Sequence, residues 1–181
     1  MTNKEEAWIQ TFSGTVFNPF NPDPSTISIN DIAHALSQIC RFGGHSSGLY
    51  SVAQHSVKVS RILPLELALQ GLMHDSAEFA VGDMPKPIKE WLPEYCELER
   101  TVWCAIADKF CLPRDLHPDV HRADRIALAT EVRDLMKPPP TSWARWLAGV
   151  TPLPDRIVPL SAQQAEDAFL GRFEELIYLG Q

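Results

Sequence analysis

The sequence predicts an all-α fold with proline-rich connections and a small β-hairpin near the N-terminus. Apolar residues recur at the three- and four-residue spacing of amphipathic helices in several long segments. The 15 prolines gather between these segments, where they end one helix before the next begins. No internal repeat or glycine-rich phosphate loop interrupts this pattern. With 181 residues, 45% of them apolar, the chain has the size of one globular domain spanning 1–181.

The N-terminal third should contain the hairpin and the first two helices. Prolines exclude a regular helix over 11–26, where Thr11–Phe17 could pair with Thr26–Ile29. A first helix should begin near Asn30 or Asp31 and end at Gly43-Gly44. After a loop of His, Ser and Gly, a second helix should carry His55 and end near Leu63.

The remaining helices follow from the same periodicity. One is expected from about Pro64 to Ala80, and two longer ones over 93–110 and 118–136. The last should span 161–179, because Ser161-Ala162-Gln163-Gln164 has the form of a capping box.

Charge and cysteine content limit the class of partner and the compartment. The net charge of −7 argues against a nucleic-acid polymer or an anionic membrane surface as a partner. No apolar run approaches the length of a membrane span, and the acidic start does not resemble a signal peptide. Cys40, Cys96, Cys104 and Cys111 form no C-x-x-C pair, so we expect reduced core thiols in a cytoplasmic protein.

The pair His74-Asp75 stands inside an apolar helical segment, where both side chains are costly to bury unless something binds them. His55 shares a predicted helix face with Val52 and Val59. Asp124 shares one with Glu131 and with the apolar residues Ala127, Leu128 and Leu135. A single helical His or Asp is usually solvated, but four directed at one buried centre predict a metal site. Two imidazoles and two carboxylates suit a divalent ion such as Zn, Co, Mn or Fe.

Further candidates surround these four residues. Glu78 lies one turn after His74 and could orient or deprotonate a water, although it could equally be a surface carboxylate. The run Arg41-Phe42-Gly43-Gly44-His45 combines groups that suit phosphate contact and base stacking. Lys86 or Lys89 could meet substrate charge, although a solvated lysine is the more common case.

His74-Asp75-Ser76-Ala77-Glu78, followed by Gly82-Asp83-Met84-Pro85-Lys86-Pro87-Ile88-Lys89 and then Asp124, resembles the HD superfamily of metal-dependent phosphohydrolases. The pattern H-D-x-x-E…G-D-x-P-x-P-x-K is similar to that of bacterial 5′-deoxynucleotidases and of small deoxynucleoside triphosphohydrolases. The resemblance covers about residues 28–136 and implies a helical HD domain.

The resemblance also implies a role for each matching residue. It assigns the metal to His55, His74, Asp75 and Asp124 and the attacking water to Glu78. It places Arg41 on phosphate, and Asp83 on the sugar or as a group that positions the phosphate. One departure is Phe42, where those deoxynucleotidases carry Trp; Phe can still stack but lacks the indole N–H.

These features predict metal-dependent hydrolysis of nucleotide phosphoesters, with (deoxy)nucleoside 5′-monophosphates as substrates. One alternative keeps the site but releases triphosphate from a deoxynucleoside triphosphate. A two-metal phosphodiesterase would need further histidines, for which His117 and His121 are available. A non-catalytic nucleotide-binding module is the alternative of another class. Apolar area around Trp143, Trp146 and the C-terminal helix predicts a homo-oligomer.

Overall fold

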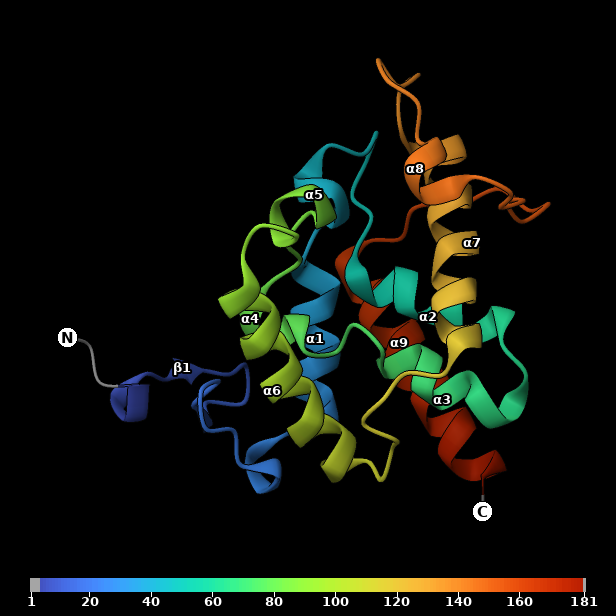
Figure 1. Ribbon diagram of the computed structural model, residues 1–181. Coiled ribbons are helices and arrows are strands. Elements are labelled where there is room, and N and C mark those ends of the chain that lie inside the picture. The colour runs from blue at the N-terminus through green and yellow to red at the C-terminus, as the bar shows by residue number, and fades with distance from the viewer. Residues whose placement is uncertain (1–3, 181) are drawn as a thin grey trace.

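Helices dominate the structure, a computed structural model that describes residues 4–180 (Figure 1). They are α1 (Ile29–Gln38), α2 (Val52–Ile62), α3 (Leu65–Met73), α4 (Glu78–Val81), α5 (Lys86–Lys89), α6 (Pro93–Lys109), α7 (Pro118–Leu135), α8 (Ala144–Leu147) and α9 (Ala162–Leu179). Strands β1 (Ile9–Gln10) and β2 (Val16–Phe17) form an antiparallel hairpin. The predicted all-α class with a small N-terminal hairpin is confirmed. Within 4–180, no helix has the length and hydrophobicity that crossing a membrane requires.

The main core lies where α9 packs against α1, α2 and α3. Leu36, Leu72 and Phe169, from three of these helices, are fully buried. Burial of each such side chain stabilises the fold by about 1.5–3 kcal/mol. The predicted capping box starts α9: Ser161 Oγ accepts from the backbone N–H of Gln164, whose Oε1 accepts from Ser161 N. The last helix therefore holds α2 and α3, which carry the candidate site.

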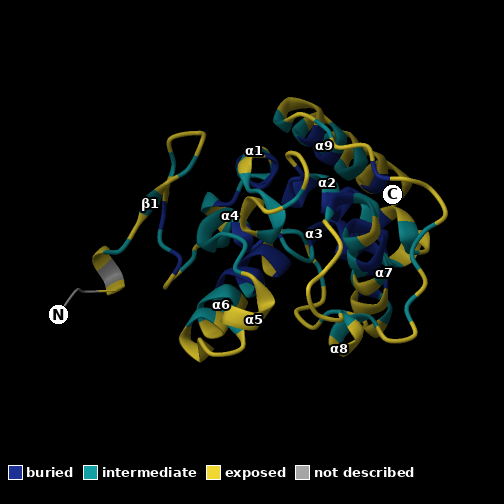
Figure 2. Ribbon diagram, turned by 90° about the horizontal axis from the view of Figure 1, so that it is seen from above, coloured by how far each residue is buried: buried dark blue, intermediate teal, exposed yellow. Residues whose placement is uncertain are grey.

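A smaller apolar cluster joins α2 to α7. Val59 of α2 packs against Ala123 and Ala127 of α7, and all three are buried. Because Asp124 follows Ala123, this contact brings Asp124 close to the α2 face that carries His55. Figure 2 shows the hairpin extending from the side of the molecule opposite α7.

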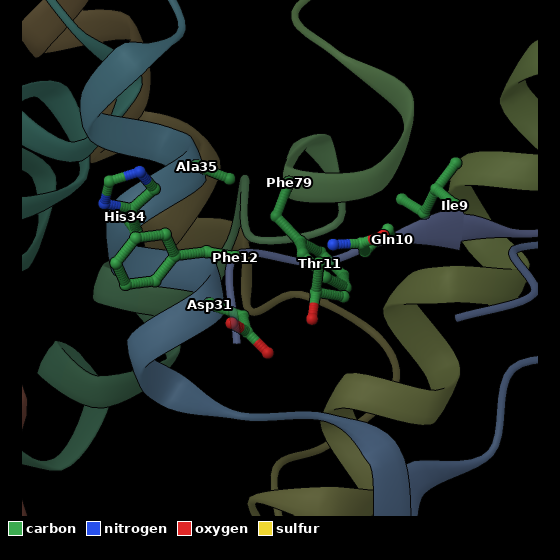
Figure 3. Close-up of a pocket in the computed structure, with 8 residues that line it drawn as sticks. All are labelled: Ile9, Gln10, Thr11, Phe12, Asp31, His34, Ala35 and Phe79. Atoms are coloured by element: carbon green, nitrogen blue, oxygen red, sulfur yellow. The ribbon is translucent and has the colours of Figure 1, made fainter. Parts of the chain in front are cut away.

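The hairpin is fastened to α1 by both polar and aromatic contacts. Buried Asp31 accepts hydrogen bonds from Ser13 N at 2.7 Å and Ser13 Oγ at 2.9 Å. The Phe12 ring stacks on His34 with the ring centroids 3.7 Å apart. A hollow of about 230 Å³ lies between the hairpin, α1 and Phe79. Figure 3 shows the side chains that line it. None of the predicted metal ligands lines this hollow.

The strand pairing differs from the one predicted. The hairpin closes within residues 9–17, and Thr26 does not pair with it; it belongs instead to a 3₁₀ turn over Pro24–Thr26. Asp23 caps this turn by accepting from Ser25 N at 2.8 Å. A proline followed by a capped turn satisfies the local backbone and leaves no extended segment to pair.

The first helix ends at Gln38, earlier than the predicted Gly43-Gly44. Ile39 and Cys40 are extended because the chain here pairs with the residues that precede and begin α2. Val52 N donates to Ile39 O, and Arg41 N donates to Tyr50 O at 2.9 Å. Residues 39–52 thus form a closed loop. Its closure brings Arg41 and Tyr50 together beside the N-terminus of α2.

The helix predicted over 64–80 is interrupted at the His74-Asp75 pair. α3 ends at Met73 and α4 begins at Glu78, and the backbone between them makes hydrogen bonds three residues apart. His74 contributes to the break because its Nδ1 lies 2.8 Å from the carbonyl oxygen of Gly71. A side chain that donates to a helical carbonyl competes with the backbone N–H that would continue the helix.

The cysteines are free, but they are not core thiols as predicted. Cys96 and Cys111 are exposed, and Cys40 and Cys104 are half-buried. Cys111 lies beyond the C-terminus of α6, in a left-handed backbone conformation with φ of 56°. Cys111 therefore does not share a helix face with Cys104.

Candidate active site

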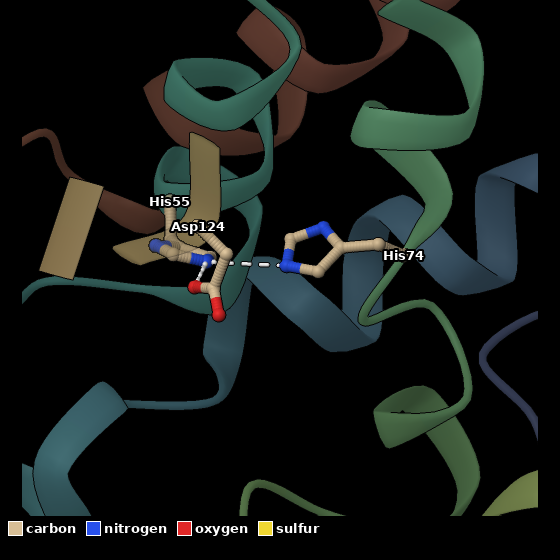
Figure 4. A group of neighbouring side chains, drawn as sticks. All are labelled: His55, His74 and Asp124. Carbon is tan, nitrogen blue, oxygen red and sulfur yellow. Dashed lines mark hydrogen bonds and ion pairs between the residues drawn. The ribbon is translucent and has the colours of Figure 1, made fainter. Parts of the chain in front are cut away.

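Three side chains from three segments, His55, His74 and Asp124, meet at one centre (Figure 4). One ligand atom each from His55 of α2, His74 after α3 and Asp124 of α7 lie within 4.8 Å of one another. His55 Nε2 is 3.4 Å from His74 Nε2 and 3.2 Å from Asp124 Oδ1. Asp75 lies beside this group, with Oδ2 3.2 Å from His74 Nε2 and 3.5 Å from His55 Nε2.

Both imidazoles are oriented by acceptors on the opposite ring nitrogen. His74 Nδ1 donates to Gly71 O at 2.8 Å, and His55 Nδ1 donates to Glu131 Oε1 at 2.6 Å. A neutral imidazole that donates from Nδ1 keeps its lone pair on Nε2. Two Nε2 lone pairs and two carboxylates are therefore directed at one another, an arrangement that only positive charge at the centre makes favourable.

The electrostatics of the cluster lead to the same conclusion. Burial and Arg41 lower the pKa of His55, but Glu131 and Asp124 outweigh them and raise it to about 9. Burial alone would raise the pKa of Asp75. The nearby His74, His55 and Arg41 outweigh burial and hold the pKa of Asp75 well below its usual range. A proton on His55 or a cation between the four groups would supply the positive charge, so metal affinity should weaken with falling pH.

The donor set fits a divalent metal ion. Two imidazole nitrogens and two carboxylate oxygens make a mixed site of the kind that Zn, Co, Mn and Fe occupy. The hydrogen bond on each Nδ1 is the supporting contact that metal-binding histidines commonly make. The ligand types do not select one metal among these.

A buried carboxylate that the sequence reasoning did not assign to the site lies behind His55. Glu131 of α7 is fully buried and contacts His55, Tyr50 and Arg41. Arg41 in turn reaches Asp75, with Nη1 3.5 Å from Oδ2. Glu131 follows Asp124 by two helical turns and therefore lies on the same face of α7, which is how the sequence could have indicated its place in the site. The sequence gives no such indication for Tyr50, because its position depends on closure of the 39–52 loop.

Glu78 carries a buried carboxyl group beside the cluster. It is 6% exposed, and its Oε2 has no hydrogen-bond partner among the described residues. Burial, together with the charges of Asp75 and Asp83, raises the pKa of Glu78 well above its usual value. An unpaired buried carboxyl group with a raised pKa is costly to the fold and is typical of functional sites.

Two uncharacterized bacterial proteins are similar to this chain in sequence over most of its length. It is 41% identical over 172 residues to the uncharacterized protein YfdR of Escherichia coli, an alignment that covers 94% of this chain and 96% of YfdR. The chain belongs to the YfdR family. An uncharacterized protein of Rhodobacter capsulatus is 32% identical over 139 residues, 71% of each chain.

A more distant similarity connects this YfdR-family chain to a named enzyme. It is 27% identical over 106 residues to the 5′-deoxynucleotidase VP0926 of Vibrio parahaemolyticus, which covers 56% of this chain and 46% of that protein. No family model matches the chain. The possible metal-binding cluster and this partial similarity together are compatible with an HD-type hydrolase.

The other predicted substrate-binding residues of this YfdR-family chain surround the centre to different degrees. Arg41 and Phe42 are half-buried, and the Arg41 guanidinium lies 5.6 Å from the centroid of the Phe42 ring. Phe42 has a left-handed backbone with φ of 56°, as does the following Gly43 with φ of 58°. His45 is exposed at the end of this turn. Its contact with substrate stays a prediction.

Asp83, Lys86 and Lys89 follow α4 along the chain. Burial raises the pKa of Asp83, while Arg41 and His55 are close enough to lower it. Lys86 is exposed at the start of α5, so its role stays a prediction. Lys89 is half-buried and paired with Glu99 of α6. Of the two lysines, Lys89 lies closer to the acidic groups of the site. Glu99, and with smaller effects Glu78 and Asp75, raise the pKa of Lys89.

The two further histidines do not join the centre. His117 caps α7 by accepting from Asp119 N at 3.2 Å, and His121 is exposed on the first turns of that helix. The histidines needed for a two-metal phosphodiesterase are therefore not brought together in the described part of the chain.

Proposed function

We propose that this protein is a metal-dependent phosphohydrolase of the HD type that converts (deoxy)nucleoside 5′-monophosphates to nucleoside and phosphate. The observation that carries the proposal is the convergence of His55, His74, Asp75 and Asp124, with both imidazoles held in the tautomer that leaves Nε2 free. The partial similarity to a 5′-deoxynucleotidase supports the nucleotide class.

Each residue has a defined task in this reaction. His55, His74, Asp75 and Asp124 would hold a divalent ion, which when bound supplies a Lewis acid for a phosphoryl oxygen and lowers the pKa of a water. Glu78 Oε2 takes the proton from the attacking water, since this buried oxygen has no other hydrogen-bond partner among the described residues. The Nη1 edge of Arg41, which lies 3.5 Å from Asp75 Oδ2, binds the phosphate.

The nucleoside is held on the loops around this centre. The Phe42 ring offers a stacking face that any base can use, which predicts weak base preference. Asp83 accepts a hydrogen bond at the sugar edge, and deoxynucleotides are the expected substrates. His45 and Lys86 complete the predicted binding surface at the solvent side.

The charge balance favours a monophosphate over a triphosphate. A phosphate monoester carries about 1.5 to 2 negative charges at pH 7, and a triphosphate carries more. Arg41 is already paired with Glu131 and Asp75, and Lys89 is paired with Glu99. These two cations face a larger number of carboxylates around the site, so additional phosphate charge would be poorly compensated.

A panel of nucleotides with separate detection of phosphate and triphosphate tests this proposal. The protein loaded with Co²⁺, Mn²⁺ or Zn²⁺ should release phosphate from deoxynucleoside monophosphates and lose activity with a chelator. Triphosphate release from deoxynucleoside triphosphates would favour the alternative reaction. Activity that survives chelation would refute the metal assignment, and binding of nucleotides without turnover would favour a non-catalytic module.

Two variants separate the roles of the residues. His74→Ala should remove both the ion and the activity, whereas His121→Ala, a matched change at an exposed histidine, should retain both. Glu78→Gln should keep the ion and lower kcat by about 100-fold or more, as for loss of a general base. Loss of the ion in Glu78→Gln would instead identify Glu78 as a ligand.

A further inference from the structure

Glu131 connects two parts of the proposed site through a single carboxylate. Its Oε1 accepts from His55 Nδ1 at 2.6 Å and from Tyr50 Oη at 3.0 Å. Its Oε2 accepts from Arg41 Nε at 3.2 Å and lies 3.1 Å from Arg41 Nη2. The side chain is fully buried, and both oxygens are occupied by donors.

The buried carboxylate is paired with a guanidinium, because Arg41 Nε and Nη2 both lie against its Oε2. A charged acceptor makes shorter and stronger hydrogen bonds than a neutral one. Each partner is thereby held in one orientation.

Two of the three partners of Glu131, His55 and Arg41, bind different groups in the proposed reaction. The bond to His55 Nδ1 fixes the tautomer that directs Nε2 at the metal centre. The paired bonds to Arg41 fix the plane of the guanidinium and leave its Nη1 edge toward Asp75 and the substrate phosphate. A movement of Glu131 would displace the metal ligand and the phosphate ligand together.

We propose that Glu131 is a positioning residue that couples the geometry of the metal site to that of the phosphate-binding arginine. Glu131 itself touches neither ion nor substrate and acts through His55 and Arg41. The inference rests on the proposed function for the phosphate role of Arg41. Its effect on metal binding depends on His55 and can be measured without any substrate.

Glutamine at this position cannot replace the carboxylate. Its side chain has nearly the same shape, but it offers one acceptor oxygen and one donor NH₂ group. In either amide orientation, the NH₂ group faces donors: His55 Nδ1–H and the Tyr50 hydroxyl, or the Arg41 guanidinium. Glu131→Gln therefore breaks one side of the network whichever way it turns.

The first experiment measures Co²⁺ binding by calorimetry in the absence of nucleotide. Glu131→Gln should weaken Co²⁺ affinity by about 10- to 100-fold, the usual effect of removing a supporting contact from a ligating histidine. Glu166→Gln is the matched control, because Glu166 also contacts a histidine, His34 Nδ1 at 3.1 Å, outside the site. It should leave Co²⁺ affinity unchanged. Equal affinities in wild type and Glu131→Gln, or equal losses in both variants, would overturn the proposal.

The second experiment separates the phosphate role from the metal role. At saturating Co²⁺, Glu131→Gln should raise KM for a deoxynucleoside monophosphate by about 10-fold, with a smaller change in kcat, because Arg41 is retained but misplaced. A fall in kcat with unchanged KM would contradict the Arg41 part. If wild type hydrolyses no nucleotide but Glu131→Gln still loses Co²⁺ affinity, the proposed function fails and the His55 part of the inference stands.

A measurement on the wild type covers the case in which Glu131→Gln does not fold. Nitrogen-15 NMR of the Zn²⁺-loaded protein reports which nitrogen of each histidine carries the proton. His55 should show a protonated Nδ1 and a metal-bound Nε2. A proton on Nε2, or a metal-bound Nδ1, would overturn the proposal without any substitution.

Discussion

Removal of the Tyr50 hydroxyl tests the buried network in isolation from catalysis. Tyr50 is fully buried and donates to Glu131 Oε1 at 3.0 Å. A hydrogen bond to a charged group contributes about 1.5–3 kcal/mol to stability. In Tyr50→Phe, Glu131 keeps its bonds to His55 and Arg41 and is not orphaned, so the lower end applies, about 1.5–2 kcal/mol. For a domain of this size, that loss corresponds to a fall in melting temperature of about 3–8 °C.

Thermal unfolding followed by circular dichroism, with chelator present, measures this loss without a contribution from bound metal. Tyr178→Phe is the control, because Tyr178 is 81% exposed and should leave the melting temperature unchanged. A Tyr50→Phe variant that melts with wild type would show that the hydroxyl does not bond to Glu131 in solution. A fall well beyond the stated range would also refute the reasoning, since it would mean that Glu131 depends on Tyr50 for its charge.

Three further predictions concern stability and assembly. Hydrogen bonds from Arg133 and Ile157 N hold the pKa of Asp134 well below its usual range, so its carboxylate stabilises the fold fully above about pH 4 and loses this effect as pH falls further. Asp134→Asn should therefore lower the melting temperature more at pH 7 than at about pH 2.5, and equal losses would contradict the assignment. In Gly71→Ala the new methyl group would overlap Leu63 Cδ1. Overpacking should outweigh the gain in helix propensity and lower the free energy of unfolding, measured by urea denaturation, by about 1–2 kcal/mol. A stabilised variant would show that Leu63 moves aside freely. The chain should form a homodimer or larger assembly, and light scattering that gives the monomer mass of 20.3 kDa at micromolar concentration would reject this.

The helices could be predicted because local rules determine them. The capping box of Ser161 and Gln164 predicts the start of α9. The spacing of apolar residues around His55 and Asp124 predicts that both side chains point inward. A set of metal ligands can also be predicted from local sequence, because burying polar groups on apolar helix faces costs free energy unless something binds them. The order of elements and the group of His55, His74 and Asp124 followed from these features.

The remaining features depend on contacts that are distant in sequence. The break after Met73 depends on competition for the Gly71 carbonyl, which helical periodicity does not report. The early end of α1 depends on pairing of Ile39 with Val52 across the loop. Glu131 has the polar character of many helix-surface residues, and its role becomes visible only when Arg41 and Tyr50 are placed against it.

The left-handed conformation of Phe42 has a consequence for attempts to engineer this protein. A bulky residue at φ of 56° costs about 1–2 kcal/mol relative to its preferred conformations, and Gly or Asn would largely avoid that cost. A selection for heat tolerance alone should therefore replace Phe42 early, and the resulting protein would be more stable but would lose the proposed stacking surface for a base. If the proposed function holds, stability and substrate recognition compete at this position, and directed evolution here should screen for both properties at once.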